Sequence, residues 1–140
     1  MSTEENKAIV RRGIEEIINK ANLAVVDELM ATNYVSHGPG GQEVNGPEGF
    51  KQLITMYRTA FPDLHYTVEH LIAEGDKVVA HYTARGTHQG DLMGIAPTGK
   101  QVTVTAMSIN RIVGGKIVEE WESVDQLAML QQIGVVPPMG

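Results

Sequence analysis

Several acidic side chains are concentrated in an otherwise apolar segment near the end of the chain. Residues 111–134 read RIVGGKIVEEWESVDQLAMLQQIG and contain Glu119, Glu120, Glu122 and Asp125. A carboxyl group that is removed from water gains a higher pKa and can then exchange protons near neutral pH. On a strand with one wet face, the same residues would only be solvated charges. A cavity wall and a solvated strand are therefore the two interpretations of this segment.

The position of Glu122 depends on the turn at Gly114-Gly115, which joins two predicted strands. In a β-hairpin the length of the turn determines which side chains share a face of the sheet. A two-residue turn places Glu122 beside Met107. A three-residue turn, which takes in the preceding valine, keeps the parity and places Glu122 opposite Ala106 and diagonal to Ser108. The residues of the turn permit both registers.

Two histidines beside Gly-rich loops are candidates for contact with a ligand. His88 follows a predicted strand, and His37 precedes a Gly/Pro-rich loop shortly after Tyr34. Imidazole titrates close to neutral pH, so a histidine can exchange protons with a ligand there. We predict His88 as a second catalytic residue and His37 as a residue at the mouth of a pocket. The alternative for both is a polar surface group.

The sequence does not indicate a metal or a cofactor. The chain has no cysteine for a thiolate site, and the His-Glu-x-x-His pattern of zinc enzymes does not occur. His81 and His88 are an odd number of residues apart and would face opposite ways on a regular strand. The Gly-rich loops at 38–46 and 86–99 lack the spacing of phosphate-binding loops. We therefore predict no metal and no cofactor.

Composition limits the remaining classes of function. The 140 residues fit one domain, 1–140, with no linker or repeat. A net charge of −6 and a pI near 5.3 argue against a surface for nucleic acid or an anionic membrane. The polar N-terminus lacks the apolar core of a signal peptide, and no window approaches the length of a transmembrane helix. A cytoplasmic location is the default expectation.

Hydrophobic spacing predicts helices in the first sixty residues and one more at the end. Ser2 and Glu5 form a capping box pattern before the first helix. Asn22 is a candidate cap for a second, shorter helix, and the pattern breaks from Ala31 to His37. A third helix begins near Pro47 and ends before Pro62. In the last helix, Asp125 is the expected cap, and the docking residues are Leu127, Leu130 and Ile133.

From residue 63 onward the spacing changes to strand-like runs joined by short turns. Helices first and a meander afterwards, without alternation of the two, predict an α+β fold. We expect three N-terminal helices on one face of an antiparallel sheet and a short C-terminal helix. The predicted strands are His65–Ala73, Lys77–Thr87, Gln101–Val113 and Lys116–Val124.

Three segments of the chain resemble a known family. The most specific are residues 86–100, GTHQGDLMGIAPTGK, and residues 111–125, RIVGGKIVEEWESVD, which precede a Gln-Gln-Ile-Gly ending. A softer match is Asn33–His37. Together they resemble the SnoaL-like polyketide cyclases and their relatives, within the cone-shaped superfamily of nuclear transport factor 2. The resemblance runs almost from end to end of the chain.

The resemblance implies a cone-shaped α+β barrel, in which a strongly curved antiparallel sheet and helices enclose a deep apolar pocket. Cyclases of this family close a ring in a polyketide methyl ester by an intramolecular aldol reaction, without cofactor or metal. They use an acidic residue on the last strand, usually Asp, which aligns with Glu122. Many relatives have His-Trp-Asp where this chain has Glu120-Trp121-Glu122, and the cyclases carry His where Ser108 stands. The resemblance favours the parity-keeping turn and implies a homodimer formed through the sheet.

We therefore expect a cofactor-independent acid/base enzyme of the cyclase or isomerase type, which acts on a small apolar carbonyl compound. Glu122 would move a proton at a carbon next to the carbonyl group, with His88 as the second catalytic candidate. Tyr82, Ser108 or Asn110 would hydrogen-bond the enolate oxygen. The residues predicted to bind the ligand are Tyr34, His37, Tyr57, Phe61, Tyr82, Met93, Ala106, Ser108, Asn110 and Trp121.

Each of these expectations has an alternative. Tyr57, Phe61, Tyr82 and Met93 are alternatively ordinary core residues, and Trp121 is alternatively an anchor in the core or in an interface. At the level of function, the first alternative is a small-molecule binding protein that uses the same pocket without turnover. The second is an epoxide hydrolase, whose Asp-Arg-Asp arrangement has no evident position on the predicted strands.

Overall fold

The computed structural model describes residues 2–137. Its first helix, α1 (Thr3–Arg12), begins in the predicted capping box. The amide of Glu5 donates to the Ser2 hydroxyl over 3.0 Å, and the Ser2 amide donates to the Glu5 carboxylate over 3.3 Å. The helix continues without a break into a π-helical segment, η1 (Gly13–Asn19). Its isoleucines are buried toward the sheet.

The remaining helices are short, apart from α3. Pro47 lies in the first turn of α3, which ends before Pro62 as predicted. The predicted cap of the second helix is wrong, because Leu23, not Asn22, occupies the N-cap position and makes no side-chain hydrogen bond there. The helices are α2 (Ala24–Leu29), a 3-10 turn η2 (Pro39–Gly41), α3 (Gly46–Ala60) and α4 (Gln126–Gln132).

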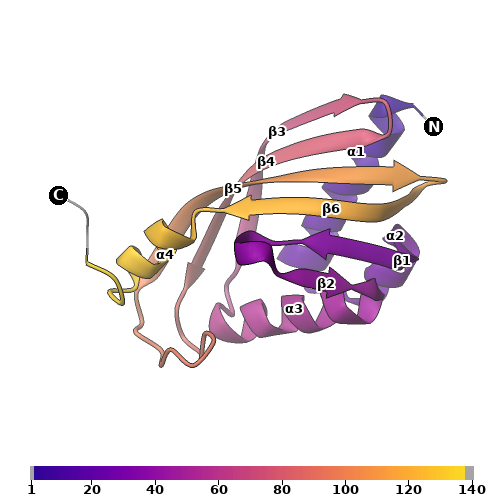
Figure 1. Ribbon diagram of the computed structural model, residues 1–140. Coiled ribbons are helices and arrows are strands. Elements are labelled where there is room, and N and C mark those ends of the chain that lie inside the picture. The colour runs from indigo at the N-terminus through magenta and orange to yellow at the C-terminus, as the bar shows by residue number, and fades with distance from the viewer. Residues whose placement is uncertain (1, 138–140) are drawn as a thin grey trace.

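Six strands form one sheet in the order β2-β1-β6-β5-β4-β3. Figure 1 shows this sheet curving strongly, with α1 behind it, α3 beneath β2, and α4 beyond the end of β6. The last four strands have the predicted bounds to within one residue. The strands are β1 (Met30–His37), β2 (Glu43–Asn45), β3 (His65–Glu74), β4 (Lys77–Thr87), β5 (Gln101–Val113) and β6 (Lys116–Val124).

The prediction of a purely antiparallel sheet is wrong. The segment that breaks the helical pattern after α2 is strand β1, which pairs parallel with β6, while β2 pairs antiparallel with β1. The sheet is therefore mixed. Local patterns do not reveal the pairing of β1 with β6, because more than eighty residues separate the strands, for example Ser36 from Glu120.

The hairpin between β5 and β6 combines features of both predicted registers. The turn has two residues, since Val113 pairs with Lys116, and both turn glycines have positive φ. Two residues further along, however, the register shifts by one, so that Arg111 pairs with Glu119 and Val118 is the extra residue of a β-bulge. The bulge restores the parity that the two-residue turn had inverted. Glu122 consequently pairs with Ser108, and not with Ala106 or Met107.

Strand β5 separates the two faces of the sheet most clearly. Its even-numbered residues from Val102 to Ile112 are buried, and most of its odd-numbered residues are exposed. The buried set contains two polar residues, Ser108 and Asn110, among valine, alanine and isoleucine. The inner face of the sheet and the helices therefore enclose a core that has one polar region, on β5 and β6.

The C-terminal helix α4 packs at the open end of the sheet. Asp125 caps it as predicted, accepting from the amide of Ala128 over 3.0 Å. The prediction that Leu127 docks the helix is wrong, because that side chain is 47% exposed, whereas Met129 and Ile133 are buried. Within residues 2–137, no helix is long and apolar enough to span a membrane.

Candidate active site

Glu122 and Glu120 lie on the inner face of β6. Across the hairpin, Glu122 pairs with Ser108 and Glu120 pairs with Asn110. Residues two apart on a strand point to the same side of the sheet. The bulge at Val118 shifts the register by one residue, so the side chains of Glu120 and Glu122 point to the inner face of the sheet. The predicted sharing of one face by Glu122 and Ser108 is confirmed.

Each of the two glutamates accepts a hydrogen bond from a buried tyrosine on a neighbouring strand. The Tyr82 hydroxyl on β4 donates to Oε2 of Glu122 over 2.6 Å. The Tyr34 hydroxyl on β1 donates to Oε1 of Glu120 over 2.7 Å. Tyr34 and Tyr82 are only 1% and 2% exposed. Strands β1 and β4 flank the β5–β6 hairpin, so the two tyrosines reach the carboxyl groups from opposite sides of that hairpin.

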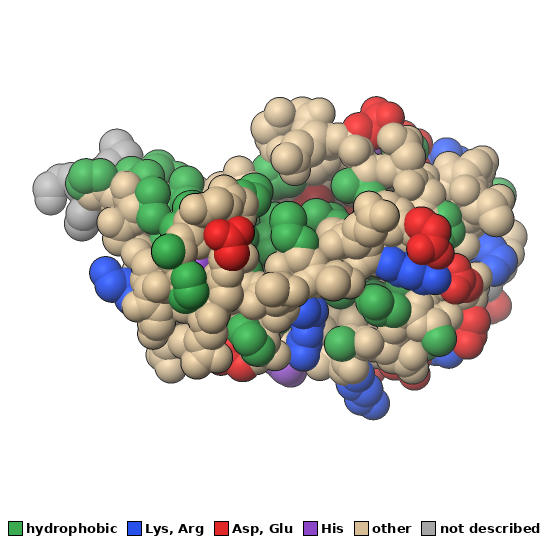
Figure 2. All heavy atoms as spheres, turned by 90° about the horizontal axis from the view of Figure 1, so that it is seen from below, with side chains coloured by type: hydrophobic (Ala, Val, Ile, Leu, Met, Phe, Trp, Pro, Cys, Tyr) green, Lys and Arg blue, Asp and Glu red, His purple; other side chains and the backbone are tan. Residues whose placement is uncertain are grey.

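Both glutamates line a cavity of about 70 Å³ between the sheet and the helices. Figure 2, viewed from the side of α3, shows hydrophobic side chains gathered around a hollow in this face of the molecule. The residues that line the cavity include no lysine, arginine or histidine. They are Val10, Gly13, Ile14, Ile17, Ile18, Met30, Ser36, Phe50, Leu53, Ile54, Tyr57, Tyr66, Tyr82, Ser108, Asn110, Ile117, Glu120 and Glu122.

A second cavity of about 50 Å³ adjoins the first one. Tyr57, Tyr66 and Glu122 line both, so these three side chains form the partition between them. The second cavity reaches α4, where Met129 forms part of its wall, and Arg85 lies on its border. Movement of the partition would join the cavities into one space that runs from η1 to α4.

The apolar surroundings change the acidity of the site. Burial raises the pKa of Glu122, and the hydrogen bond from Tyr82 opposes this rise. Burial, and secondly the charge of Glu122, raise the pKa of Glu120 to about 8. Burial also raises the pKa of Tyr66, which stacks on Tyr82 with 4.5 Å between ring centroids. The pKa of each carboxyl group is thus raised, which brings it closer to the range in which a group exchanges protons at neutral pH.

Several predicted ligand-binding residues do lie together around Glu122. Tyr57, Tyr82, Ser108 and Asn110 line the first cavity, and Phe61 lines the second. The amide nitrogen of Asn110 donates to the Ser108 hydroxyl over 3.0 Å. Tyr34 contacts the site through Glu120, and Ala106 is buried on the same inner face, opposite Val124.

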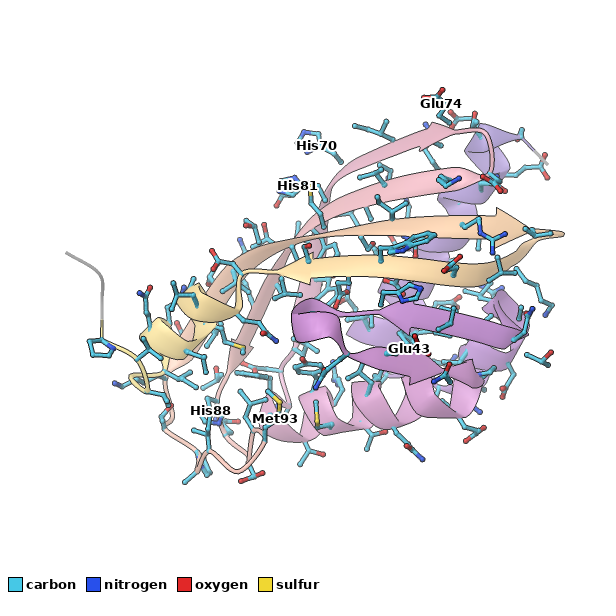
Figure 3. The ribbon with its side chains drawn as sticks, in the orientation of Figure 1. Glu43, His70, Glu74, His81, His88 and Met93 are labelled. Carbon is cyan, nitrogen blue, oxygen red and sulfur yellow. The ribbon has the colours of Figure 1, made fainter. Side chains whose placement is uncertain are left out.

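His88 and Met93 lie away from these cavities, in the loop between β4 and β5 (Figure 3). His88 is fully buried, and its Nδ1 lies 3.1 Å from the Thr98 hydroxyl and accepts from the Thr98 amide. Its ring packs against Phe61. Met93 is 53% exposed. The contacts of His88 are those of a residue that holds its loop together, and they do not bring it to Glu122.

His37 and Trp121 lie on the outer face of the sheet, opposite to Glu122. They stack on each other at 5.7 Å, and His37 Nε2 lies 2.8 Å from a carboxylate oxygen of Glu119. Arg111 donates to the same carboxylate over 3.3 Å. The inner neighbour of His37, Ser36, lines the cavity instead. Adjacent residues on a strand face opposite ways, which separates this outer cluster from the site.

Sequence reasoning missed Glu120, Ser36 and Tyr66 as residues of the site. A signal for Glu120 was present, because it lies two residues before Glu122 on the same strand and therefore on the same face. No comparable signal existed for Ser36, which reaches the cavity through the parallel pairing of β1 with β6. Within residues 2–137, no group of three or more His, Asp or Glu side chains could hold a metal ion.

The amino-acid sequence is similar to those of methyl ester cyclases from Streptomyces. The aklanonic acid methyl ester cyclase DnrD of Streptomyces peucetius is 31% identical over 137 residues, which cover 96% of this chain and 92% of the relative. The nogalonic acid methyl ester cyclase of Streptomyces nogalater is 31% identical over 111 residues, covering 78% of this chain and 83% of the relative.

Solved structures with the same fold include two from Streptomyces. AclR, a proposed hydroxylase from Streptomyces galilaeus, superposes with a TM-score of 0.87 at 29% identity, covering 99% of this chain and 87% of AclR. IdmH, a proposed polyketide cyclase from Streptomyces antibioticus, superposes with a TM-score of 0.82 at 31% identity, covering 92% of this chain and 98% of IdmH.

The family model described as SnoaL-like polyketide cyclase matches residues 8–133, a range that contains Glu120, Glu122 and both of their tyrosine partners. The match extends over most of the chain, and the alignments with the two cyclases cover 92% and 83% of their lengths. The chain is therefore a member of the SnoaL-like polyketide cyclase family.

Proposed function

We propose that this protein is a cofactor-independent cyclase in which Glu122 transfers the proton at a carbon next to a carbonyl group. The observation that carries the proposal is the position of Glu122, on the wall of an apolar cavity and hydrogen-bonded to Tyr82. Burial raises its pKa. A carboxylate with a raised pKa is a stronger base than a solvated one, so it removes a weakly acidic C–H proton more readily.

An intramolecular aldol closure needs one group that takes up a proton and later returns it. Glu122 takes the proton from the carbon, the resulting enolate carbon attacks a second carbonyl carbon, and a carbon–carbon bond forms. The oxygen of that second carbonyl group then receives the proton from Glu122 and becomes a hydroxyl group. No atom is gained or lost, which is consistent with a site built from protein side chains alone.

The polar residues of β5 are suited to the oxygen atoms of such a substrate. Ser108 and Asn110 line the cavity on the strand that pairs with Glu122 and Glu120. Preorganised donors that face a developing oxyanion contribute about 3–4 kcal/mol in enzymes where one has been removed. Asn110 donates to the Ser108 hydroxyl and to the carbonyl oxygen of Val78, so we assign the Ser108 hydroxyl to donate to the carbonyl oxygen of the ligand and Asn110 to position that hydroxyl.

The substrate class follows from the relatives and from the cavity walls. The relatives are named for aklanonic and nogalonic acid methyl esters. The apolar lining of both cavities favours a compound of comparable character. The cavities of about 70 and 50 Å³ are smaller than typical ligand pockets of about 300–1,000 Å³, so binding requires the partition at Tyr57 and Tyr66 to move and the joined space to widen.

The test is turnover of aklanonic and nogalonic acid methyl esters by the purified protein, followed by chromatography, because the cyclised product is an isomer. Glu122→Gln keeps the shape of the side chain and removes the proton acceptor. We expect it to lower kcat by at least about a hundredfold, the usual contribution of a general base. Glu119→Gln, on the outer face of the same strand, is the matched control and should retain activity. Full turnover by Glu122→Gln would contradict the role of Glu122.

The two alternative functions are less well supported. A binding protein without turnover does not need a carboxyl group with a raised pKa in an apolar wall, whereas Glu122 has one. An epoxide hydrolase with an Asp-Arg-Asp arrangement would need aspartates in the site. The residues that line the two cavities include Arg85 but no aspartate.

We also propose that two copies of the chain pair through the outer face of the sheet. Ile72, Val79, Ile109 and Trp121 are successive cross-strand neighbours on β3, β4, β5 and β6, and we call them the outer row. Ile72 is 64% exposed and Ile109 is 40% exposed. Contiguous exposed apolar side chains mark interaction surfaces. A second copy presents the same row and can cover it by two-fold symmetry.

A further inference from the structure

The cavity contains a second carboxyl group, that of Glu120, which has no role in proton transfer by Glu122 as proposed above. Glu120 and Glu122 are two residues apart on β6, which separates their Cα atoms by about 6–7 Å. Within the described part of the chain, each has one hydrogen-bonded oxygen, to Tyr34 or Tyr82. Both residues line the cavity, so a ligand there can contact their carboxyl groups. A carbonyl group that lies across the two carboxyl groups can contact one of them through its oxygen atom and the other through the proton of its adjacent carbon.

Only one negative charge is favourable on this pair. The groups that face it are the tyrosines Tyr34, Tyr57, Tyr66 and Tyr82, from β1, α3, β3 and β4, and none of them is a cation. Arg85 lies only on the second cavity. Two like charges in a site of low polarity disfavour each other, so one carboxyl group keeps its proton. Accordingly, burial and the charge of Glu122 raise the pKa of Glu120 to about 8.

The geometry distinguishes the two groups. Glu122 lines both cavities, whereas Glu120 lines only the inner one, next to Asn110 and Ser36. A ligand that extends from the second cavity into the first passes Glu122 and ends at Glu120. Ser36 and Asn110 are the cross-strand neighbours of Glu120 on β1 and β5, so polar side chains flank that inner end, where a carbonyl oxygen is most easily accommodated.

We propose that Glu120 is a second catalytic residue, a protonated carboxylic acid that donates its proton to the carbonyl oxygen of the ligand while Glu122 removes the proton from the adjacent carbon. This inference rests on the proposed function of Glu122. With proton donation by Glu120, the intermediate is a neutral enol in place of an enolate. The two glutamates then act as a bifunctional acid/base pair.

The proton balance gives this arrangement its advantage. Before the step, Glu120 is protonated and Glu122 is ionised. In the step, the C–H bond breaks and its proton goes to Glu122, while the O–H bond of Glu120 breaks and its proton goes to the carbonyl oxygen. Afterwards Glu122 is protonated, Glu120 is ionised, and the ligand is a neutral enol. The pair carries one negative charge throughout, so no additional charge develops in the apolar cavity.

The aldol step restores the pair. The enol carbon attacks the second carbonyl group, Glu120 takes back the enol proton, and Glu122 gives its proton to the new alkoxide. If Glu122 returns its proton to a different carbon instead, the same cycle gives an isomerisation. Both outcomes leave Glu120 protonated and Glu122 ionised, ready for the next turnover.

The first experiment does not depend on any natural substrate. The probe is 2-tetralone, a small apolar ketone whose acidic protons exchange with deuterium in D2O, followed by NMR with catalytic amounts of protein. We expect the wild-type protein to accelerate exchange and both Glu120→Gln and Glu122→Gln to reduce the acceleration by at least about a hundredfold. Glu119→Gln should exchange at the wild-type rate. Exchange by Glu120→Gln at the wild-type rate would overturn the proposal.

The second experiment separates a proton donor from a residue that only supports the fold. The pH profile of exchange should have two limbs, one from ionised Glu122 and one from protonated Glu120. Glu120→Gln should lose the alkaline limb, and Glu120→Asp, which retains the acid, should keep it at a lower rate. An alkaline limb that persists in Glu120→Gln would contradict the role of Glu120.

The two proposals can fail separately. If neither methyl ester cyclises but exchange of 2-tetralone depends on both glutamates, the cyclase function fails and the acid/base pair stands. If a methyl ester cyclises with Glu122 and without any contribution from Glu120, the function stands and the pair fails. A wild-type protein that accelerates neither reaction overturns both.

Discussion

At the level of single residues, the site depends on how each glutamate is hydrogen-bonded. Tyr82 donates to Glu122 over 2.6 Å, and Tyr34 donates to Glu120 over 2.7 Å. A donor that faces a carboxyl group stabilises its ionised form. Burial acts in the opposite direction and is the larger effect on both glutamates. The tyrosines thus limit how far the two pKa values rise, and their replacement should reveal this.

Tyr82→Phe is expected to raise the pKa of Glu122 further, because a hydrogen bond that lowers it is lost. Glu122 must be ionised to act as a base, so the acid limb of the pH profile moves to higher pH. A hydrogen bond to a charged group is worth about 1.5–3 kcal/mol, which corresponds to roughly tenfold or more in rate below neutral pH. The measurement is kcat/KM against pH for the wild type and the variant.

Tyr34→Phe is the matched comparison for that experiment. It removes the donor to Glu120, which must be protonated to act, so here the alkaline limb moves to higher pH. Unchanged limbs in both variants would show that these hydrogen bonds do not control the acidity of the site.

At the level of elements, the loop between β4 and β5 is joined closely to the end of α3. The amides of Gln89 and Gly90 both donate to the carbonyl oxygen of Ala60, over 3.0 and 3.1 Å. A Cβ atom on Gly90 would lie 2.0 Å from the carbonyl oxygen of Thr59. Only glycine permits this close approach of loop and helix, which also encloses His88.

Gly90→Ala is therefore expected to destabilise the fold by about 1–3 kcal/mol, the usual cost of overpacking. The matched control is Gly13→Ala in η1, where the new Cβ meets Leu29 at an ordinary 3.8 Å. In a helical backbone this second change should stabilise by about 0.5–1 kcal/mol. Urea unfolding of both variants measures the two effects, and equal values would contradict the argument.

At the level of the whole molecule, the outer row leaves apolar area uncovered on a sheet whose other face is packed against helices. In a two-fold pair each copy contributes the same patch. Ile109 lies within the row, between Val79 and Trp121 on the neighbouring strands. A charge at this position would be desolvated if the pair forms and harmless if it does not.

The wild-type chain is expected to sediment at micromolar concentration with twice its mass of 15.2 kDa. Ile109→Glu should sediment as a monomer, because pairing would bury its charge. Met93→Glu places the same charge on an exposed loop residue away from the row and should remain paired. A wild-type protein that is monomeric at these concentrations would refute the pairing.

Sequence reasoning recovered the elements and the family better than it recovered the site. The capping box at Ser2, the turn at Gly114-Gly115 and the last four strands follow from local patterns, and all are present. Glu122 was singled out because the resemblance to the family aligns the acidic residue of its last strand with this position, whereas the residues alone left a solvated strand carboxylate as the alternative. His88, His37 and Trp121 were predicted around the pocket from their types and their neighbouring loops. The structure does not bring them to Glu122, because side-chain direction depends on strand parity and on loop contacts.

The amino-acid sequence alone establishes the helices and the last four strands, since the period of hydrophobic residues is a local property. It does not reveal β1, which lies where the helical pattern breaks, or β2, which lies in the Gly/Pro-rich loop. Only the tertiary structure decides which way the carboxylates face. One extra residue, Val118, bulges from β6 and turns Glu120 and Glu122 inward, and no local pattern records a bulge. The parallel pairing of β1 with β6 then brings Tyr34 and Ser36 to the same cavity. The acid/base site therefore arises from contacts between segments that are distant in the chain.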